Sequence, residues 1–249
     1  MAFAKKTLKD ITVKNKRVVL RADYNVPIDS EGHISDDYRI VQSIPTIEYL
    51  LKHNCKVIII SHMGRPKVPR EPSLSLRPVA KRLSKLLDKP VQFAEDCVGE
   101  VAQRAVAALE GGQVLVLENL RYYPAEEAND DNFAKQLAAH GEIFVQDAFG
   151  VVHRAHASTS AITKHLPSVA GLLLSKEVDT LTTVMEKPER PLMAVIGGAK
   201  ISDKIDVLNR LISIADFVAI GGGMANTFLL ARGYEVGKSL VEKDELSLA

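Results

Sequence analysis

The side chains best suited to chemistry lie in one stretch, residues 145–160. This stretch contains Asp147, His153, Arg154 and His156. They follow an apolar run at residues 143–145, which is typical of a buried strand. In open α/β sheets the ligand crevice lies beyond the carboxyl ends of the strands, so polar side chains just past such a run are candidate ligand contacts. Because histidine and arginine predominate here, the stretch indicates a site for an anion.

Three more apolar runs have the same character, and each is followed by a polar loop. They cover residues 17–20, 57–60 and 114–117. Their valine, isoleucine and leucine content predicts strands that are buried in a sheet. Because the carboxyl ends of parallel strands meet at one edge, the loops would bring their side chains together there. The residues that we expect at this edge are Arg21, Asp23, Asn25, His62, Arg65, Arg121, His153 and Arg154.

Amphipathic helices are predicted between these strands. Apolar residues recur at helical spacing over residues 40–51 and 76–87, and a third helix over residues 132–140 ends at Gly141. Strands that alternate with helices are typical of a parallel sheet with right-handed crossovers. The sequence therefore predicts an α/β protein with a doubly wound, Rossmann-like sheet in its first part.

Arg39 lies where the first of these helices begins. A cation in a first helical turn opposes the helix dipole unless an anion is close to both. Arg39 is therefore a candidate ligand contact. A surface ion pair with Asp36 or Asp37 would explain the residue equally well from local sequence alone.

The loops change in character beyond Pro188, where glycine and lysine replace arginine and histidine. Predicted strands at residues 192–196 and 217–220 lead into G-G-A-K-I-S-D-K and G-G-G-M-A-N. Glycine lets backbone amides approach a ligand closely, and Lys204 is expected in the first turn of a helix capped by Ser202. These features indicate nucleotide phosphates. Tight strand-to-helix turns also need glycine, however, and neither a P-loop nor a full dinucleotide fingerprint is present.

Pro188 and Pro191 indicate a boundary between two domains. We expect a first domain over residues 1–174, a hinge helix over 175–187 and a second domain over 188–249. About sixty residues after the boundary are too few for a doubly wound domain, which typically has ~100–150. The last eight residues also predict the opening of a helix without a stop signal. The second doubly wound domain is therefore expected to be incomplete.

Composition excludes several classes of protein. Hydrophobic residues make up 46% of the 249-residue chain, enough for substantial cores, and the net charge of +1 provides no general attraction to nucleic acids or acidic membranes. No apolar run approaches the ~18 residues of a membrane helix. The two cysteines, Cys55 and Cys97, fit a reducing compartment better than a disulfide scaffold. We expect a cytoplasmic globular protein.

Other kinds of site are less well supported. Zinc binding at His153 and His156 would need two further ligands, and none is evident at a suitable spacing, so no metal site is expected. Ser61 and His62 could be a nucleophile and its base, but neighbouring residues rarely face each other and no orienting acid is apparent. A core histidine would be the common explanation of His62, but the other strand ends supply the same positive charge. The absent dinucleotide fingerprint argues against a dehydrogenase.

Seven motifs together resemble the phosphoglycerate kinase family, in order and at that family's spacing. They are R-A-D-Y-N-V-P, D-D-Y-R-I, S-H-M-G-R-P, E-N-L-R-Y-Y, D-A-F-G-V-V-H-R-A-H-A-S, G-G-A-K-I-S-D-K and I-G-G-G-M-A-N-T-F. Each is weak alone, but the resemblance covers essentially all 249 residues. It implies a reaction of glycolysis, the reversible phosphoryl transfer between ATP and 3-phosphoglycerate that gives 1,3-bisphosphoglycerate and ADP, with Mg²⁺.

The resemblance also implies roles for particular residues. Arg39, Lys200 and Lys204 would be catalytic, and Arg39 would stabilise the transferred phosphoryl group. The substrate-binding residues would be Asp23, Asn25, Arg39, His62, Met63, Gly64, Arg65, Arg121, His153 and Arg154. The nucleotide-binding residues would be Gly198, Lys200, Lys204, Gly221, Gly222 and Gly223. A monomer that binds small molecules is implied, with the Mg²⁺-associated residue in the part of the family's sequence that this chain lacks.

The chemistry of these residues agrees with that reaction. Phosphoryl transfer needs cations and amides around the phosphoryl oxygens and in-line positioning rather than covalent work by the protein. A carboxylate nucleophile is already ionised, so no general base is required, and arginine suits a triply anionic substrate. Closure of the two domains would exclude water. Because part of the family's nucleotide domain is missing, the alternative is an inactive fragment that retains only the anion site.

Overall fold

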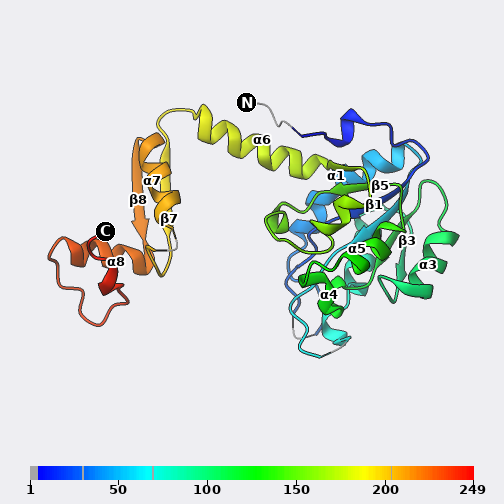
Figure 1. The fold of residues 1–249 in the computed structure, drawn as a ribbon, viewed down its shortest axis with the longest axis horizontal. Helices are drawn as coiled ribbons and strands as arrows, with labels where there is room; N and C mark the ends of the chain where they lie inside the picture. The colour runs from blue at the N-terminus through cyan, green and yellow to red at the C-terminus, as the bar shows by residue number, and fades with distance from the viewer. Residues whose placement is uncertain (1–4, 30, 69, 203) are drawn as a thin grey trace. The chain divides into compact units, whose positions relative to one another are not determined.

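The computed structural model describes residues 5–29, 31–68, 70–202 and 204–249. The chain divides into two compact units, Met1–Asp179 and Thr180–Ala249. Both units combine strands with helices (Figure 1). No helix in the part of the chain that the structure describes is long and apolar enough to cross a membrane.

The first unit is built on a six-stranded parallel sheet. Its strands are β1 (Arg17–Arg21), β2 (Lys56–Ile60), β3 (Val91–Ala94), β4 (Val114–Leu117), β5 (Ile143–Gln146) and β6 (Ser168–Ala170). They are ordered β3-β4-β2-β1-β5-β6. From β1 the chain continues to β2, its neighbour on the β3 side of the sheet, whereas from β5 it continues to β6 at the opposite edge. The carboxyl ends of β1 and β5 therefore border a switch point, where ligands of open α/β sheets bind.

Helices pack on both faces of this sheet. They are α1 (Tyr38–Lys52), α2 (Arg77–Leu87), α3 (Gly99–Ala108), α4 (Pro124–Glu127) and α5 (Asp131–Ala138). Short 3₁₀ helices cover Leu8–Asp10, Pro72–Leu74, Leu120–Tyr122, Phe149–Val151 and Ala161–Lys164. Successive strand residues point to opposite faces, so Val18 and Leu20 of β1 join the core with α1 and α2, whereas Val19 joins the core with α3 and α5. These two cores fix the strand ends that carry the polar loops.

The second unit contains a two-stranded parallel sheet with a small core. Its elements are β7 (Met193–Gly197), α7 (Ile205–Ile214), β8 (Phe217–Gly221), α8 (Gly222–Ala231) and a 3₁₀ helix at Lys243–Glu245. The buried members of its core are Ile196, Ile201, Leu208 and Met224. The remaining helix, α6 (Leu172–Glu186), has residues in both units. It begins three residues before the predicted hinge helix.

The structure confirms the predicted α/β class and the parallel sheet of the first unit. Each predicted strand lies within one residue of its observed bounds. Among the strands and α-helices of the first unit, four were not predicted: the strands β3 and β6, both at an edge of the sheet, and the helices α3 and α4. The β3 sequence V-Q-F-A is short and has an exposed Gln92, because a strand at the edge of a sheet is only partly covered.

The predicted start of the helix after β7 is wrong. α7 begins at Ile205, so Lys204 lies at the N-cap position rather than in the first turn, and Ser202 does not cap the helix. The Ser202 hydroxyl instead donates to Glu242 Oε1 at 2.7 Å. The backbone N–H of Glu242 donates to Thr227 Oγ1 at 3.1 Å, which fixes this residue in extended backbone. Where the sequence predicts the opening of a helix, Lys243–Glu245 form a short 3₁₀ helix.

Candidate functional site

A pocket of about 290 Å³ lies in the first unit, where the loops after β1, β2, β4 and β5 meet. It is lined by Asp23, Asn25, Arg39, His62, Gly64, Arg65, Arg121, Gly150, Val151 and Arg154. Eight of the ten residues predicted to bind substrate are in this set. They come together because the parallel strands that carry their loops end at one edge of the sheet.

Four of the lining residues are arginines, and they repel one another. The Arg121 side chain is only 6% exposed: its Nη1 donates to the carbonyl of Gly64 at 2.7 Å, and its Nε lies 3.0 Å from Glu127 Oε1. Burial lowers the pKa of the Arg121 guanidinium, and although Glu127 raises this pKa, the positive charges of Arg154 and Arg65 lower it. An anion in the pocket would relieve this repulsion.

Three of these arginines have donors that form no hydrogen bond among the described residues, and one such donor is the Arg121 Nε, which is close to Glu127 without a hydrogen bond to it. The Nε of Arg154 is buried and has no hydrogen-bond partner within the described part of the chain. Arg65 is exposed, and no described side chain forms an ion pair with it. A buried donor without an acceptor is costly, so an oxygen atom of a bound anion would stabilise this arrangement.

Arg39 lies in the first turn of α1 and forms an ion pair with Asp23, not with Asp36 or Asp37. The Asp36 carboxylate instead accepts from the N–H of Tyr38 at 2.8 Å. Asp23 therefore supplies the anion that a cation at this helix end requires. The side chain of Arg39 remains half exposed, so part of its guanidinium can still reach a ligand.

His62 is a neutral hydrogen-bonding group in the wall of the pocket. Its Nδ1 lies 3.1 Å from Arg21 Nη2. Burial lowers the pKa of the imidazole to about 2, and the charges of Arg21, Arg121 and Arg154 lower it further. Because Arg21 can only donate, Nδ1 of the neutral ring accepts and the ring proton resides on Nε2. His62 can therefore donate to an anion without carrying charge.

Arg21 was expected at the edge of the site, but it is a buried structural residue. Its side chain is 1% exposed and does not line the pocket. It donates to Ser158 Oγ at 2.9 Å and to the carbonyl of Ala22 at 2.5 Å. Together with the contact to His62, these bonds join the loops that follow β1, β2 and β5. Arg21 therefore stabilises the loops of the site without lining the pocket.

Two predicted substrate residues do not line the pocket. Met63 is 2% exposed and packs in the core with α1 and α2. His153 is exposed on the loop after β5 and is absent from the pocket wall. His156, from the same stretch, lies with its Nδ1 3.8 Å from the carboxylate of Glu126. The predicted cluster thus divides, and Arg154 alone of its four members lines the pocket.

Sequence reasoning missed Asn119, which positions two of the loops. Its Nδ2 donates to the carbonyls of Met63 at 2.8 Å and Leu74 at 2.9 Å, while its Oδ1 accepts from the N–H groups of Met63 and Arg121. An asparagine before a helical turn is the available signal. Gly150 was also missed: a Cβ there would be 2.7 Å from Asp23 Oδ2, so glycine lets this loop approach the carboxylate.

The glycines of the second unit allow two loops to pack closely. Gly222 has φ +68°, and a Cβ there would be 3.0 Å from the carbonyl oxygen of Gly198. A Cβ at Gly198 would be 3.0 Å from Lys204 Cε, so this lysine runs along the glycine loop. The N–H of Ser202 and that of its predecessor already donate to Glu242.

The second unit therefore offers lysines, but some of its loop amides are already occupied. Lys200 is exposed and Lys204 is partly buried, and both remain able to contact an anion. The predicted residues Gly198, Gly221, Gly222 and Gly223 all lie where β7 and β8 end. Among the described residues, no group of three or more His, Cys, Asp or Glu side chains could hold a metal ion.

Asp147, the first polar residue after β5, stabilises the start of α6. Its Oδ1 accepts from the N–H groups of Leu173 at 2.9 Å and Leu174 at 3.1 Å, whereas Oδ2 has no partner among the described atoms. Burial raises the pKa of this carboxyl from 3.8 to about 6, against the effect of hydrogen bonds from Thr46 and these two amides. The folded chain therefore binds the Asp147 proton more tightly than the unfolded chain does.

The Asp147→Asn substitution should stabilise the chain at pH 7 and have little effect near pH 4. Because the folded pKa is raised, the stabilising contribution of this group is fully present below about pH 4 and is lost as the pH rises through about 6. Asparagine retains an acceptor for α6 without the charge, and the expected gain at pH 7 is about 1–3 kcal/mol. Denaturant unfolding from pH 4 to 8 would measure it. If the unfolding free energies of the unmodified chain and of Asp147→Asn differed by the same amount at every pH, the raised pKa of Asp147 would be contradicted.

Comparisons with known proteins agree on one family. The model of the family described as Phosphoglycerate kinase matches residues 8–249. The phosphoglycerate kinases of Pelotomaculum thermopropionicum and Moorella thermoacetica are each 53% identical over 247 residues, which are 99% of this chain and 63% of theirs. The structure of phosphoglycerate kinase from Coxiella burnetii matches with a TM-score of 0.83 and 40% identity, over 98% of this chain and 61% of that one. The chain thus spans less than two thirds of the length of these relatives.

Proposed function

The chain belongs to the phosphoglycerate kinase family, and on that premise we propose that it serves reversible phosphoryl transfer between ATP and 3-phosphoglycerate, which gives 1,3-bisphosphoglycerate and ADP in glycolysis. The observation that carries the proposal is the pocket with four arginines in the first unit. A ligand with a phosphate and a carboxylate matches this concentration of positive charge. Arginine binds both groups through paired N–H donors.

The side chains in the pocket can bind and orient such a ligand. We assign the phosphate and carboxylate contacts to Arg65, Arg121 and Arg154, with neutral His62 as a further donor. Asp23 and Asn25 would contact the remainder of the substrate, since both line the pocket and the Asn25 Oδ1 already fixes the N–H of Gly64 at 2.8 Å. A carboxylate nucleophile needs no base, and positioning is therefore the main task of this pocket.

Arg39 is the residue that we assign to the phosphoryl group in transit. Charge accumulates on the phosphoryl oxygens during transfer, and a guanidinium held in place beforehand stabilises it. The pair with Asp23 holds Arg39 against the pocket, while half of its side chain remains exposed. Its position in the first turn of α1 adds the dipole of that helix to the same anion site.

For the second unit we propose contacts to the phosphates of ATP or ADP. Lys200 and Lys204 would neutralise phosphate charge, and we assign them catalytic roles with Arg39. The glycine positions Gly198 and Gly221–Gly223 would allow a nucleotide to approach the backbone. The exposed or partly exposed ammonium groups fit an anionic ligand. Mg²⁺, when bound, would screen charge between the phosphates; its protein contact is expected outside this chain.

We also propose the domain arrangement, location and assembly that the family implies. Residues 1–174 would bind 3-phosphoglycerate, 175–187 would act as a hinge helix, and 188–249 would begin the nucleotide-binding domain. Support for the hinge comes from α6, whose residues belong to both compact units. We propose a cytoplasmic monomer with small-molecule ligands.

Calorimetric titration of this chain with 3-phosphoglycerate, and then with Mg-ADP, tests the proposal. Saturable binding of 3-phosphoglycerate at one site per chain is expected, because the pocket lies wholly within the first unit. Circular dichroism of the same sample would show that the chain is folded. A folded chain that binds no 3-phosphoglycerate would contradict the proposal.

A second candidate function is a non-catalytic domain that retains only the 3-phosphoglycerate site. The observation that favours it is the composition of the second unit, whose two strands leave Val195 76% and Phe217 65% exposed. Exposed apolar side chains on a sheet are typical of a surface that normally packs against further structure. Binding of 3-phosphoglycerate without any binding of Mg-ADP would favour this alternative, whereas binding of both would favour the enzyme.

A further inference from the structure

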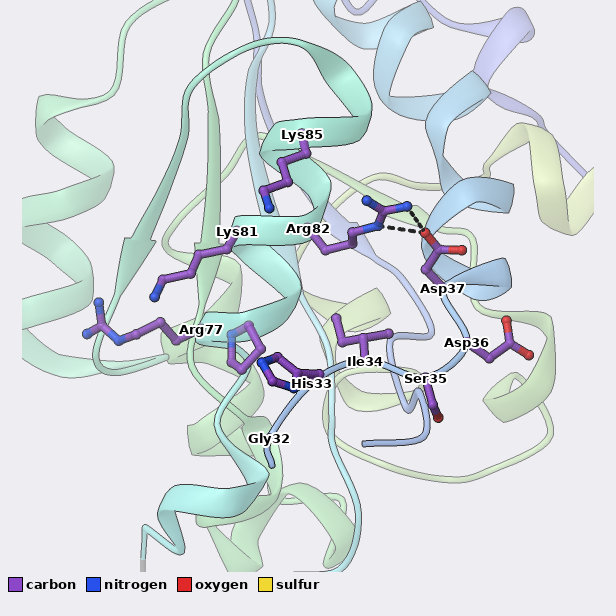
Figure 2. A pocket seen from close by; sticks show the side chains of 11 residues that line it. Gly32, His33, Ile34, Ser35, Asp36, Asp37, Arg77, Lys81, Arg82 and Lys85 are labelled. Carbon is purple, nitrogen blue, oxygen red and sulfur yellow. Dashed lines mark hydrogen bonds and ion pairs between the residues drawn. The ribbon is translucent and has the colours of Figure 1, made fainter. Parts of the chain in front are cut away.

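A second pocket in the first unit, of about 620 Å³, shares no residue with the arginine pocket. One wall is formed by residues 32–37, which precede α1, and the other by the side of α2 that runs from Arg77 to Lys85. Figure 2 shows the basic side chains of α2 along this wall. The volume is within the range of small-molecule sites, about 300–1,000 Å³.

Two of the four cations on α2 are already paired. Arg82 contacts the Asp37 carboxylate through Nε at 2.7 Å and Nη2 at 2.6 Å, and this pair joins the two walls (Figure 2). The Arg77 Nη2 lies 2.5 Å from Glu95 Oε1, and its guanidinium carbon is 4.6 Å from the centre of the Phe93 ring. These arginines therefore give the pocket its shape rather than free charge.

Lys81 and Lys85 have no ion-pair or hydrogen-bond partner among the residues that the structure describes. They are four positions apart on α2, so their ammonium groups lie on one side of the helix and repel each other. Asp36, on the opposite wall, accepts from the N–H of Tyr38 at 2.8 Å, and Figure 2 shows its carboxylate directed away from both lysines. Two adjacent positive charges are thus left unmatched at the pocket.

The spacing of these charges selects among anions. One helical turn separates Lys81 from Lys85, a rise of about 6 Å along the axis. Two separate phosphate ions beside these lysines would repel each other, whereas phosphates linked in one chain arrive together and engage both lysines as one ligand. Ile34 on the first wall and Pro78 on the second offer an apolar surface beside the charges.

We propose that this pocket binds a chain of linked phosphates, either free inorganic polyphosphate or the polyphosphate part of a nucleotide. The site is independent of the proposed function, since its lining residues are different. Lys81 and Lys85 supply the charge, and the Arg82–Asp37 pair keeps the wall before α1 against α2. A bound phosphate chain would offset the repulsion between the Lys81 and Lys85 ammonium groups, which no described residue offsets in the unliganded helix.

The test is titration of the whole chain with tripolyphosphate at fixed ionic strength, followed by the backbone amide NMR shifts of residues 32–37 and 77–85. Saturable shifts in these segments are expected, with tripolyphosphate at least tenfold tighter than orthophosphate. The double variant Lys81→Gln/Lys85→Gln should bind at least tenfold more weakly. A matched control, Lys14→Gln/Lys135→Gln, removes two exposed lysines outside the pocket and should bind like the unmodified chain.

Two further arms identify the source of the phosphates and the location of the site. ATP that binds these segments as tightly as tripolyphosphate would show recognition of the phosphate chain alone, and tighter ATP binding would show that the apolar wall also contacts the nucleoside. The Arg65→Ala variant should leave these shifts unchanged. The proposal is overturned if the lysine double variant binds like the unmodified chain, if orthophosphate binds as tightly as tripolyphosphate, or if the shifts do not saturate.

Discussion

Replacing Arg65 by alanine should weaken 3-phosphoglycerate binding by about ten- to a hundredfold, because charge-assisted hydrogen bonds each contribute about 1.5–3 kcal/mol. Arg65 lines the arginine pocket, is exposed and pairs with no described side chain. Its removal therefore leaves no buried group without a partner. The free energy of unfolding should change by less than about 0.5 kcal/mol, which is usual for surface substitutions.

Calorimetry on the variant and on Arg104→Ala would separate a specific contact from a general effect of charge. Arg104 lies on α3 and is exposed; its Nη2 is 4.0 Å from Glu100 Oε2, and its Nε donates to the Glu100 carbonyl at 3.4 Å. Both variants lose one positive charge, but only Arg65→Ala should lose affinity. An intermediate affinity in Arg65→Lys would show that paired donors matter beyond charge. Equal affinities in all the variants would exclude the arginine pocket as the substrate site.

The sequence predicted the loops of the arginine pocket well, because each loop is recognisable from the few residues around one strand end. Each strand is an uninterrupted apolar run, and the residue type changes sharply where the run ends, as at Ile60 before His62 and at Leu117 before Arg121. Parallel pairing then brings the loops to one edge without further information. The set of loops at the site could therefore be predicted from the order of motifs alone.

The direction of each side chain within these loops could not be predicted. Arg21 and Met63 each follow or end a strand and were expected in the site, but both point into the interior. Met63 lies in a loop, where no fixed period assigns side chains to one side, and Arg21 is the last residue of β1, so contacts with distant residues decide where both side chains point. The partners of Arg21, such as Ser158, are 137 positions away in the sequence. The pocket beside α2 was missed for the same reason, because the Arg82–Asp37 contact joins segments 45 positions apart.

Replacing Arg21 by alanine should lower the free energy of unfolding by about 3–5 kcal/mol, the effect of removing one partner from a buried charged network. Glu126 is fully buried and accepts from the Ser158 backbone N–H at 3.0 Å and from its hydroxyl at 2.5 Å. Ser158 Oγ in turn accepts from Arg21 Nε at 2.9 Å. Burial lowers the pKa of the Arg21 guanidinium, and the Glu126 carboxylate opposes this effect.

Denaturant unfolding of Arg21→Ala beside Arg17→Ala would isolate the buried network. Arg17 lies at the other end of β1, where its half-exposed side chain is 3.9 Å from the Glu142 carboxylate, so its loss should cost at most about 1 kcal/mol. A double variant, Arg21→Met/Glu126→Gln, removes both charges. Its loss of unfolding free energy should be smaller than the sum of the losses in Arg21→Met and in Glu126→Gln. Additive losses would show that Arg21 and Glu126 act independently, and a loss below about 1 kcal/mol in Arg21→Ala would refute its structural role. His62 and Arg154 line the pocket and lie on the loops that Arg21 joins. A large loss of unfolding free energy in Arg21→Ala would therefore show that Arg21, although outside the pocket, holds the pocket's loops together.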